Sequence, residues 1–224
     1  MCASAENQNV RPAAHDDSQA VYRHDARPPC TSGYLVPVVV RACRAAGARR
    51  ILDLGCGNGM LCRALADAGF EVVGVEPSPS GVAVAARAVP EGVFRCGSVY
   101  DGPAIVPESD FDVVVSTEVV EHLFRPSALP ALAFAKLKPG GRFVVSTPYH
   151  GYLKNLLLAL ANRWDSHHSP LWDGGHVKFW SRRTLTALLE ANGFRVLEFH
   201  GAGRFPGLWK SMVLVAQKTS GGRT

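Results

Sequence analysis

Two carboxylates and an imidazole lie within five residues of one another in the segment TEVVEHL, residues 117–123, which directly follows an apolar run. If a helix began at Thr117, then Glu118, Glu121 and His122 would stand at positions i, i+3 and i+4 and would share one helical face. Three such side chains can converge on one divalent ion. The alternative is an ordinary solvated first turn, where acidic residues are favourable in any helix.

A second group of residues suited to chemistry is the glycine-rich turn DLGCGNG, residues 53–59. Its glycines lack Cβ atoms, so a ligand can approach the backbone closely. Glu76 ends the next apolar run, where its carboxylate can accept hydrogen bonds from the two hydroxyls of a ribose. Met60 stands where a dinucleotide-binding turn needs a small residue, which disfavours a pyrophosphate ligand. The alternative is a tight turn without a ligand.

Alternating strand and helix patterns surround both groups. The patterns predict strands at 49–55, 70–76, 92–98, 111–117 and 142–147, with helices at 32–46, 58–69, 78–89 and within 127–141. A helix at 181–193 and strands at 194–201 and 209–218 complete the chain. This alternation predicts an α/β fold with a mostly parallel sheet and right-handed crossovers.

Residues 147–180 interrupt this alternation and hold three of the four tryptophans and four of the eight histidines. A segment that follows the fifth strand lies at the carboxyl ends of the sheet, where a substrate lid is expected. A small satellite core under a long loop is the alternative. His150 lies just past a strand end and is our candidate for a general base that removes a hydroxyl proton.

Four motifs, LDLGCGNG, VEPS, FDVVVSTEVVEHL and KPGGRFVVSTP, follow one another in this order and resemble the class I S-adenosylmethionine-dependent methyltransferases over about residues 31–217. The resemblance implies a Rossmann-like, seven-stranded, mostly parallel sheet with helices on both faces, an antiparallel last strand and an inserted cap after the fifth strand. It also implies S-adenosylmethionine as the cofactor. The residues implied to bind it are Asp53, Gly55, Cys56, Gly57, Asn58, Gly59, Glu76, Pro77, Ser98, Val99, Thr117 and Glu118.

Within this resemblance, the glycine turn would cradle the amino-acid part of the cofactor, and Glu76 would hold the ribose. Ser98 and Val99 would line the adenine, and Thr117 with Glu118 would face the methyl donor. Ser98 is a departure from the family pattern, because many relatives carry an acid at this position.

The ExxEH pattern and the later segment GGHVKFW, residues 174–180, together resemble the metal site of small-RNA 2′-hydroxyl methyltransferases. ExxEHL also resembles the ubiquinone-biosynthesis O-methyltransferases. By this resemblance Glu118, Glu121, His122 and His176 would hold a divalent ion, which could be Mg, Mn, Fe, Co or Zn. Such an ion would lower the pKa of a substrate hydroxyl and orient its oxygen towards the methyl group.

The sequence therefore predicts an O-methyltransferase acting on a small molecule with adjacent oxygens, such as a catechol or a vicinal diol. The catalytic candidates are His122 and His150. Two alternatives stay open: a metal-independent enzyme that methylates nitrogen, oxygen or carbon, and an RNA 2′-O-methyltransferase. A cofactor-binding protein without catalysis is disfavoured by the intact motifs.

Charge and composition bear on the partners and the location. Residues 1–122 carry 10 basic and 15 acidic side chains, and residues 123–224 carry 14 and 4. The basic residues are scattered and accompany no nucleic-acid-binding pattern, so we expect a small-molecule partner rather than nucleic acid, and a homodimer stays open. The six cysteines form no CxxC pair, which favours a reducing, cytoplasmic location.

The same reading of the chain predicts no membrane insertion or export, because no apolar run is long enough and the first thirty residues are polar. Residues 1–30 are predicted to be a flexible N-terminal arm. Residues 31–224 are predicted to form the methyltransferase domain, with its cap at about 147–180.

Overall fold

A computed structural model of the chain describes residue 27, residues 29–168 and residues 170–220. The expected N-terminal arm falls almost entirely outside these described residues. The strands are β1 (Arg50–Leu54), β2 (Glu71–Glu76), β3 (Val93–Cys96), β4 (Phe111–Thr117), β5 (Leu137–Pro148), β6 (Phe194–Ala202) and β7 (Ser211–Lys218). The helices are α2 (Ser32–Ala45), α3 (Met60–Asp67), α4 (Pro79–Ala88), α5 (Ala128–Lys136), α6 (Tyr152–Leu160), α7 (Trp164–His168) and α8 (Arg182–Glu190).

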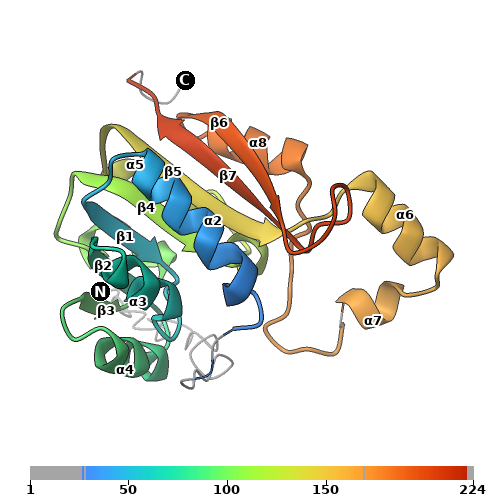
Figure 1. The fold of residues 1–224 in the computed structure, drawn as a ribbon, viewed down its shortest axis with the longest axis horizontal. Helices are drawn as coiled ribbons and strands as arrows, with labels where there is room; N and C mark the ends of the chain where they lie inside the picture. The colour runs from blue at the N-terminus through green and yellow to red at the C-terminus, as the bar shows by residue number, and fades with distance from the viewer. Residues whose placement is uncertain (1–26, 28, 169, 221–224) are drawn as a thin grey trace, which may run out of the picture.

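The strands form one seven-stranded sheet in the order β3-β2-β1-β4-β5-β7-β6, as Figure 1 shows. Neighbouring strands are parallel from β3 to β5, and β7 runs antiparallel to both β5 and β6. The predicted Rossmann-like fold, with its antiparallel last strand, is therefore confirmed. The chain reverses its winding direction between β1 and β4, and open α/β sheets bind ligands at the carboxyl ends of strands at such a point.

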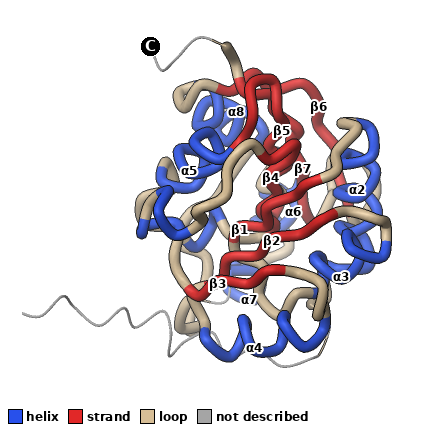
Figure 2. Tube along the Cα trace, turned by 90° about the vertical axis from the view of Figure 1, so that its left-hand side faces the viewer, coloured by secondary structure: helices blue, strands red, loops and turns tan. Residues whose placement is uncertain are grey.

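Helices cover both faces of the sheet, with α2 and α3 on one side and α5 and α8 on the other (Figure 2). Strand β7 shows why both faces must be covered, because its buried side chains alternate between the two cores. Met212 and Leu214 pack on the side of α5 and α8, whereas Val213 and Val215 pack on the side of α2 and α3. A strand buried on both faces reads as a continuous apolar run in the sequence.

The helix expected to begin at Thr117 is absent, and this prediction was wrong. Glu118 adopts a left-handed backbone conformation with φ of 56°, and its N–H donates to the carbonyl oxygen of Ser146 on β5. Only a single 3₁₀ turn follows, from Val120 to His122, and helix α5 begins at Ala128. The positive φ breaks the i, i+3, i+4 register on which the shared helical face depended.

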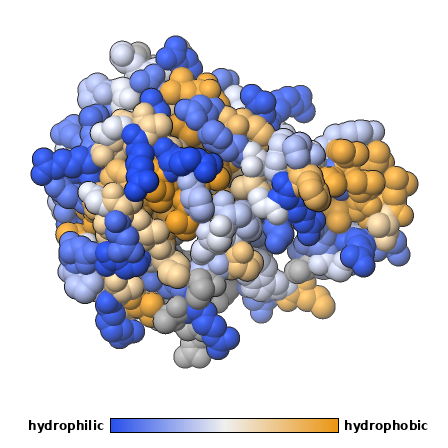
Figure 3. Space-filling model, in the orientation of Figure 1, coloured by the Kyte–Doolittle hydropathy of each residue, from blue (hydrophilic) through white to orange (hydrophobic). Residues whose placement is uncertain are grey.

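Helices α6 and α7 lie in the segment between β5 and α8, and they stand away from the sheet in Figure 1. We call residues 149–180 the cap. The apolar side chains on α6 are unusually exposed: Tyr152 is 83% exposed and Leu160 is 75% exposed. Figure 3 shows the resulting hydrophobic surface over this protruding end. In the part of the chain that the structure describes, no helix has the length and apolarity needed to cross a membrane.

Candidate active site

A pocket of about 1230 Å³ opens at the carboxyl ends of β1, β2 and β4 and extends under the cap. Ligand sites of drug-sized molecules commonly occupy about 300–1,000 Å³, so this volume has room for a cofactor and a substrate together. Most of the site residues predicted from the sequence line it. These are Asp53, Gly55, Cys56, Gly57, Asn58, Glu76, Pro77, Ser98, Thr117, Glu118, His122 and His176.

The glycine-rich turn joins β1 to α3 with closely packed backbone. Gly55 has φ of 80°, and a Cβ atom there would lie 2.5 Å from Cγ2 of Val119. Gly59 has φ of 78° and precedes α3, and its Cβ would lie 2.7 Å from the Cα of Ala85 on α4. Gly55 lines the pocket, whereas Gly59 lies outside the lining and lets α3 pack against α4. At Gly55 the backbone itself therefore forms the pocket wall, because no side chain fits at this position.

Glu76 lies at the end of β2 and is only 5% exposed. Its Oε2 accepts a 3.0 Å hydrogen bond from the N–H of Gly57, and its Oε1 accepts one of 3.0 Å from Ser78. These two bonds hold the carboxylate against the glycine turn. Each carboxylate oxygen has a second lone pair, so Glu76 can still accept from a ligand hydroxyl in the pocket.

Asp53 offers a negative group on the opposite side of the turn. It is 1% exposed, and its Oδ1 has no hydrogen-bond partner among the described residues. Burial raises the pKa of this carboxyl to about 7, although a hydrogen bond from Cys62 opposes the shift. A buried carboxylate oxygen facing a pocket is a suitable partner for an ammonium group. S-adenosylmethionine carries an ammonium and a ribose, so Asp53, Glu76 and the turn fit this cofactor.

The segment after β3 differs in part from its expected role. Ser98 lines the pocket, and its hydroxyl oxygen accepts from the N–H of Tyr100 at the start of a 3₁₀ turn. Val99 does not line the pocket; it is 8% exposed and packs in the core on the side of α5. Tyr100 lines the pocket in its place. Successive side chains point in different directions in a 3₁₀ turn, so Val99 and Tyr100 face different surroundings.

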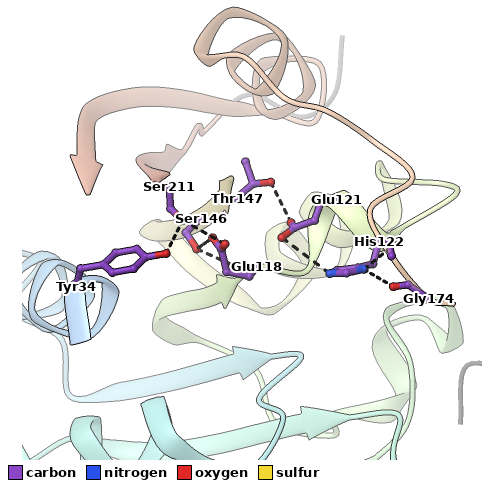
Figure 4. Close-up of polar contacts among 9 residues, drawn as sticks. Tyr34, Glu118, Glu121, His122, Ser146, Thr147, Gly174 and Ser211 are labelled. Carbon is purple, nitrogen blue, oxygen red and sulfur yellow. Dashed lines mark hydrogen bonds and ion pairs between the residues drawn. The ribbon is translucent and has the colours of Figure 1, made fainter. Parts of the chain in front are cut away.

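Glu118 points away from Glu121 and His122, as Figure 4 shows. Its Oε1 accepts a 2.8 Å hydrogen bond from Ser146, and its Oε2 accepts one of 3.2 Å from Ser211. The hydroxyl group of Tyr34 on α2 lies 3.3 Å from Ser211 Oγ. The left-handed backbone at Glu118 turns its side chain towards β5 and β7, so the structure does not bring Glu118 together with the other residues expected to hold an ion.

The remaining three residues do come together. One ligand atom from each of Glu121, His122 and His176 lies within 4.8 Å of the others. Glu121 is 1% exposed; its Oε2 accepts from Thr147, and its Oε1 has no hydrogen-bond partner among the described residues. Nε2 of His122 lies 4.0 Å from this Oε1. We call these three residues the Glu121 group.

The backbone of the cap orients His122. Its Nδ1 lies 2.9 Å from the carbonyl oxygen of Gly174 and 3.3 Å from that of Gly175. A carbonyl can only accept, so Nδ1 carries the proton and Nε2 presents its lone pair towards Glu121. Metal-ligating histidines commonly show this arrangement, with the second ring nitrogen fixed by a carbonyl. The chemistry and orientation of the Glu121 group therefore fit a divalent ion.

Burial affects the protonation of every group in this region. It raises the pKa of Glu118 to about 7, and it raises that of Glu121 well above its usual range, with the Glu118 charge adding to the effect. It lowers the pKa of His122, and it lowers that of His176 to about 4. The imidazoles are therefore neutral and lie beside a carboxyl group that resists ionisation. A bound cation would favour the ionised form of this carboxyl group and would thereby stabilise the site.

His150 does not line the pocket. It is 9% exposed and lies among other cap side chains, and burial lowers its pKa to about 3. An imidazole with such a pKa is a weak base at neutral pH. The structure thus places His150 where it cannot remove a substrate proton at the pocket. Its position just past β5 made it a candidate, but that position does not determine where the ring points.

Several pocket residues were not among the site residues predicted from the sequence. Leu123 and Phe124 follow the 3₁₀ turn, and Trp172 and Val177 reach the pocket from the cap. The cap residues could have been found from the lid prediction, because aromatic side chains in a lid commonly face its ligand. Leu35 and Leu61 line the pocket from α2 and α3 and read in the sequence as ordinary helix core.

Comparison with known proteins supports the cofactor that the geometry of the pocket fits. A family described as "Methyltransferase domain" matches residues 22–198. The chain is 34% identical over 171 residues to a ubiquinone biosynthesis O-methyltransferase of Bradyrhizobium diazoefficiens, covering 72% of this chain and 64% of the relative. It is 33% identical over 161 residues to a protein of the same name from Rhodopseudomonas palustris, covering 68% and 60%. The chain thus spans less than two thirds of the length of these relatives.

Solved structures share the fold at lower sequence identity. Magnesium protoporphyrin IX methyltransferase from Synechocystis, with bound S-adenosylhomocysteine, superposes with a TM-score of 0.65 at 20% identity, covering 91% of this chain and 94% of that one. A 1,6-didemethyltoxoflavin-N1-methyltransferase from Burkholderia thailandensis gives a TM-score of 0.61 at 19% identity, covering 82% and 77%. From its matched family, its relatives and its fold, the chain belongs to the S-adenosylmethionine-dependent methyltransferase domains.

Proposed function

We propose that this protein is an S-adenosylmethionine-dependent O-methyltransferase that uses a divalent ion, held by Glu121, His122 and His176, to methylate a hydroxyl of a small catechol or vicinal diol. The observation that carries the proposal is the buried Oε1 of Glu121, which has no hydrogen-bond partner among the described residues and faces two imidazoles. Leaving such a group unsatisfied is costly, and a cation removes that cost.

The cofactor wall accounts for binding and orientation. S-adenosylmethionine, when bound, supplies an electrophilic methyl group on its sulfonium sulfur. Asp53 would pair with the ammonium, and Glu76 would accept from the ribose hydroxyls while the N–H groups of Gly57 and Ser78 hold its carboxylate in place. The end of β4 would then face the donor end, because Thr117 and Glu118 line the same pocket.

The Glu121 group accounts for the choice of an oxygen nucleophile. A divalent ion, when bound, lowers the pKa of a coordinated hydroxyl, which is otherwise a poor nucleophile at neutral pH. Adjacent oxygens allow a substrate to chelate, which supports a catechol or vicinal diol. The curated relatives named O-methyltransferases are consistent with this choice. Two imidazoles with one carboxylate favour Mn²⁺, Fe²⁺, Co²⁺ or Zn²⁺ over Mg²⁺.

Glu118 is suited to receive the hydroxyl proton. It lines the pocket, and its carboxylate oxygens are positioned by Ser146 and Ser211. Its pKa of about 7 lies near the pH at which a general base is most effective. In this mechanism Glu118 replaces His150 as the base. The cap, through Trp172 and Val177, excludes water from the same space.

The metal requirement is tested by chelation and substitution. The chelator-treated protein is assayed for methyl transfer to a panel of catechols and vicinal diols and for Mn²⁺ binding by electron paramagnetic resonance. We expect turnover only with added metal. Glu121→Gln should abolish Mn²⁺ binding and lower turnover at least about 100-fold, while the affinity for S-adenosylhomocysteine stays within about twofold.

Glu198→Gln is the matched control, because Glu198 forms another Glu–His pair with His200, at 2.8 Å on strand β6, outside the pocket. It should leave both readouts unchanged. Full turnover in the presence of chelator, or Mn²⁺ binding by Glu121→Gln equal to that of the control, would exclude the metal mechanism. Turnover in chelator would instead favour metal-independent methyl transfer.

The role of Glu118 is tested by the pH dependence of kcat/KM at saturating metal. The carboxylate form accepts the proton, so activity should fall as the pH drops through the pKa of Glu118, which burial raises to about 7 and which a bound cation would lower from that value. Glu118→Gln should lower kcat by about 100-fold or more and remove this acidic limb from the residual activity. An unchanged limb in Glu118→Gln would assign the titration to another group.

A further inference from the structure

The cap contains a second cluster of metal-ligating side chains, separate from the Glu121 group. His150 lies two residues past the end of β5, and His167 with His168 ends the short helix α7. One ring nitrogen from each of these three residues lies within 4.8 Å of the others. The two clusters share no residue, and the cap cluster contains no carboxylate. We call these three residues the cap histidines.

The rings of the cap histidines are packed closely. The His150 and His168 rings are stacked, with centroids 5.5 Å apart and planes at 22°, and the His167 ring meets His168 edge-on at 4.9 Å. Phe179 stands edge-on to His150 and His168, at 5.1 and 4.8 Å. The ring centroids of Trp164 and His168 are 4.2 Å apart. Aromatic walls therefore surround the converging imidazoles on several sides.

One ring nitrogen within this cluster lacks an ordinary partner. Nε2 of His168 is buried and has no hydrogen-bond partner among the described residues. Buried polar atoms are nearly always hydrogen-bonded or bound to an ion. Stacked imidazoles that served only as packing would leave this nitrogen unsatisfied at a cost, whereas coordination to a cation would satisfy it.

The protonation state also suits coordination. Burial lowers the pKa of His150 to about 3 and that of His167 to about 4, and it lowers that of His168 as well. Lys154 on α6 adds to all three shifts. The neutral imidazole is the form that binds a metal. Lys154 opposes a nearby cation: burial lowers its pKa to about 8, which leaves most of it protonated at neutral pH, and its Nζ donates to the carbonyl oxygen of Tyr149.

We propose that His150, His167 and His168 bind a transition-metal ion of the Zn²⁺ class at a second site, and that this ion fastens helix α7 to the end of strand β5. Imidazole ligands suit Zn²⁺, Cu²⁺ and Ni²⁺, whereas Mg²⁺ and Ca²⁺ require oxygen ligands that this trio does not supply. Tetrahedral zinc with bonds of about 2.0–2.1 Å needs its nitrogen ligands about 3.3 Å apart. The ring nitrogens lie within 4.8 Å of one another, and rotation of the side chains with a small shift of α7 would bring them to this distance.

The structural consequence concerns the cap over the pocket. Helix α7 has five residues and no buried side chain, so little else holds it in place. The start of the cap is joined to its end by the N–H of His150, which donates to the carbonyl oxygen of Trp180. His168 also lines the pocket. An ion at the cap histidines would therefore order one wall of the pocket.

The test uses the full chain, purified without a histidine tag and stripped with chelator. Glu121→Gln with His176→Gln serves as the background, because it disables the Glu121 group. Zn²⁺ is titrated in competition with a chromophoric chelator. We expect one equivalent of Zn²⁺ to bind to the background protein, and adding His167→Asn with His168→Asn should weaken this binding at least 100-fold. Failure of the background to bind Zn²⁺ would overturn the proposal.

A matched control removes an imidazole elsewhere. His200→Asn in the same background replaces a histidine on β6 that belongs to neither cluster, and Zn²⁺ binding should remain within threefold. If the α7 double variant also stays within threefold, the cap histidines do not bind the ion. Circular dichroism and thermal unfolding establish that each variant is folded.

A second readout separates binding from fastening. Hydrogen exchange of the amides in residues 164–168 should slow when Zn²⁺ is added to the background protein, and it should not change in the double variant. Exchange that is unaltered although Zn²⁺ binds would overturn the fastening role. Neither readout depends on methyl transfer, so the outcome stands independently of the proposed reaction.

Discussion

The two walls of the pocket are built in different ways. The cofactor wall consists of strand ends and a glycine turn, where backbone groups are fixed by hydrogen bonds such as those from Gly55 and Cys56 to Val75, at 2.8 and 3.0 Å. The cap wall consists of short helices and loops, and its side chains are largely exposed. The comparison teaches that the cofactor wall depends mainly on backbone geometry fixed by hydrogen bonds, whereas the cap wall depends on individual side chains that long-range packing brings together.

The strongest test of the cofactor wall is Gly59→Ala. The new Cβ would meet the Cα of Ala85 at 2.7 Å, and φ of 78° adds about 1–3 kcal/mol of backbone strain. We expect a loss of stability in urea unfolding beyond that range and at least a 100-fold weaker affinity for S-adenosylhomocysteine by calorimetry.

Gly69→Ala is the control for strain alone. Gly69 has φ of 91°, and its Cβ would meet nothing within 4 Å. This variant should lose only the strain energy and keep its cofactor affinity. If the two variants lose the same stability and the same affinity, close packing of the turn is not what determines binding.

A smaller effect is expected from Glu76→Gln. The change removes the charge that accepts from Gly57 and Ser78, and charged hydrogen bonds contribute about 1.5–3 kcal/mol. Affinity for S-adenosylhomocysteine should therefore fall by about 10- to 100-fold. Glu71→Gln is the control at the other end of β2, where Glu71 makes exposed ion pairs with Arg49 and Arg50, and affinity should not change. Equal effects of both substitutions would remove Glu76 from the cofactor wall.

The smallest effect is expected in the cap. Leu160→Gln on α6 replaces an apolar side chain that is 75% exposed, so the free energy of unfolding should change by less than about 0.5 kcal/mol. Leu185→Ala on α8, where the side chain is fully buried, should cost about 2–5 kcal/mol by the same measurement. A large loss in Leu160→Gln would show that the cap contributes to the stability of the fold as the sheet does.

The contrast between the cofactor wall and the cap also explains which features could be predicted from the sequence. The alternation of apolar runs and helical periods predicted the sheet, because buried strands and amphipathic helices have distinct periods. Gly55 and Glu76 were recognisable because a turn and a strand end place them without reference to distant residues. In the cap, proximity depends on long-range packing, so the convergence of His150 with His168 had no local signal.

The error at Glu118 has a specific cause. Spacing of i, i+3 and i+4 predicts a shared face only if the backbone is helical, and one left-handed residue voids that condition. Non-glycine residues with positive φ are uncommon, so the sequence favoured the helix. The trio of Glu121, His122 and His176 nevertheless assembled, because the single 3₁₀ turn keeps two of them adjacent and the cap returns the third.

The return of the cap at His176 depends on one backbone oxygen. The carbonyl of Glu121 accepts 2.9 Å hydrogen bonds from both Val177 and Lys178. Through its main chain, Glu121 therefore holds the segment that carries His176 beside the segment that carries Glu121 and His122. Under the proposed mechanism, the same residue would also be a ligand through its side chain. A cation bound to the Glu121 group would then favour the closed cap by mass action, because it would bind the form in which His176 lies close.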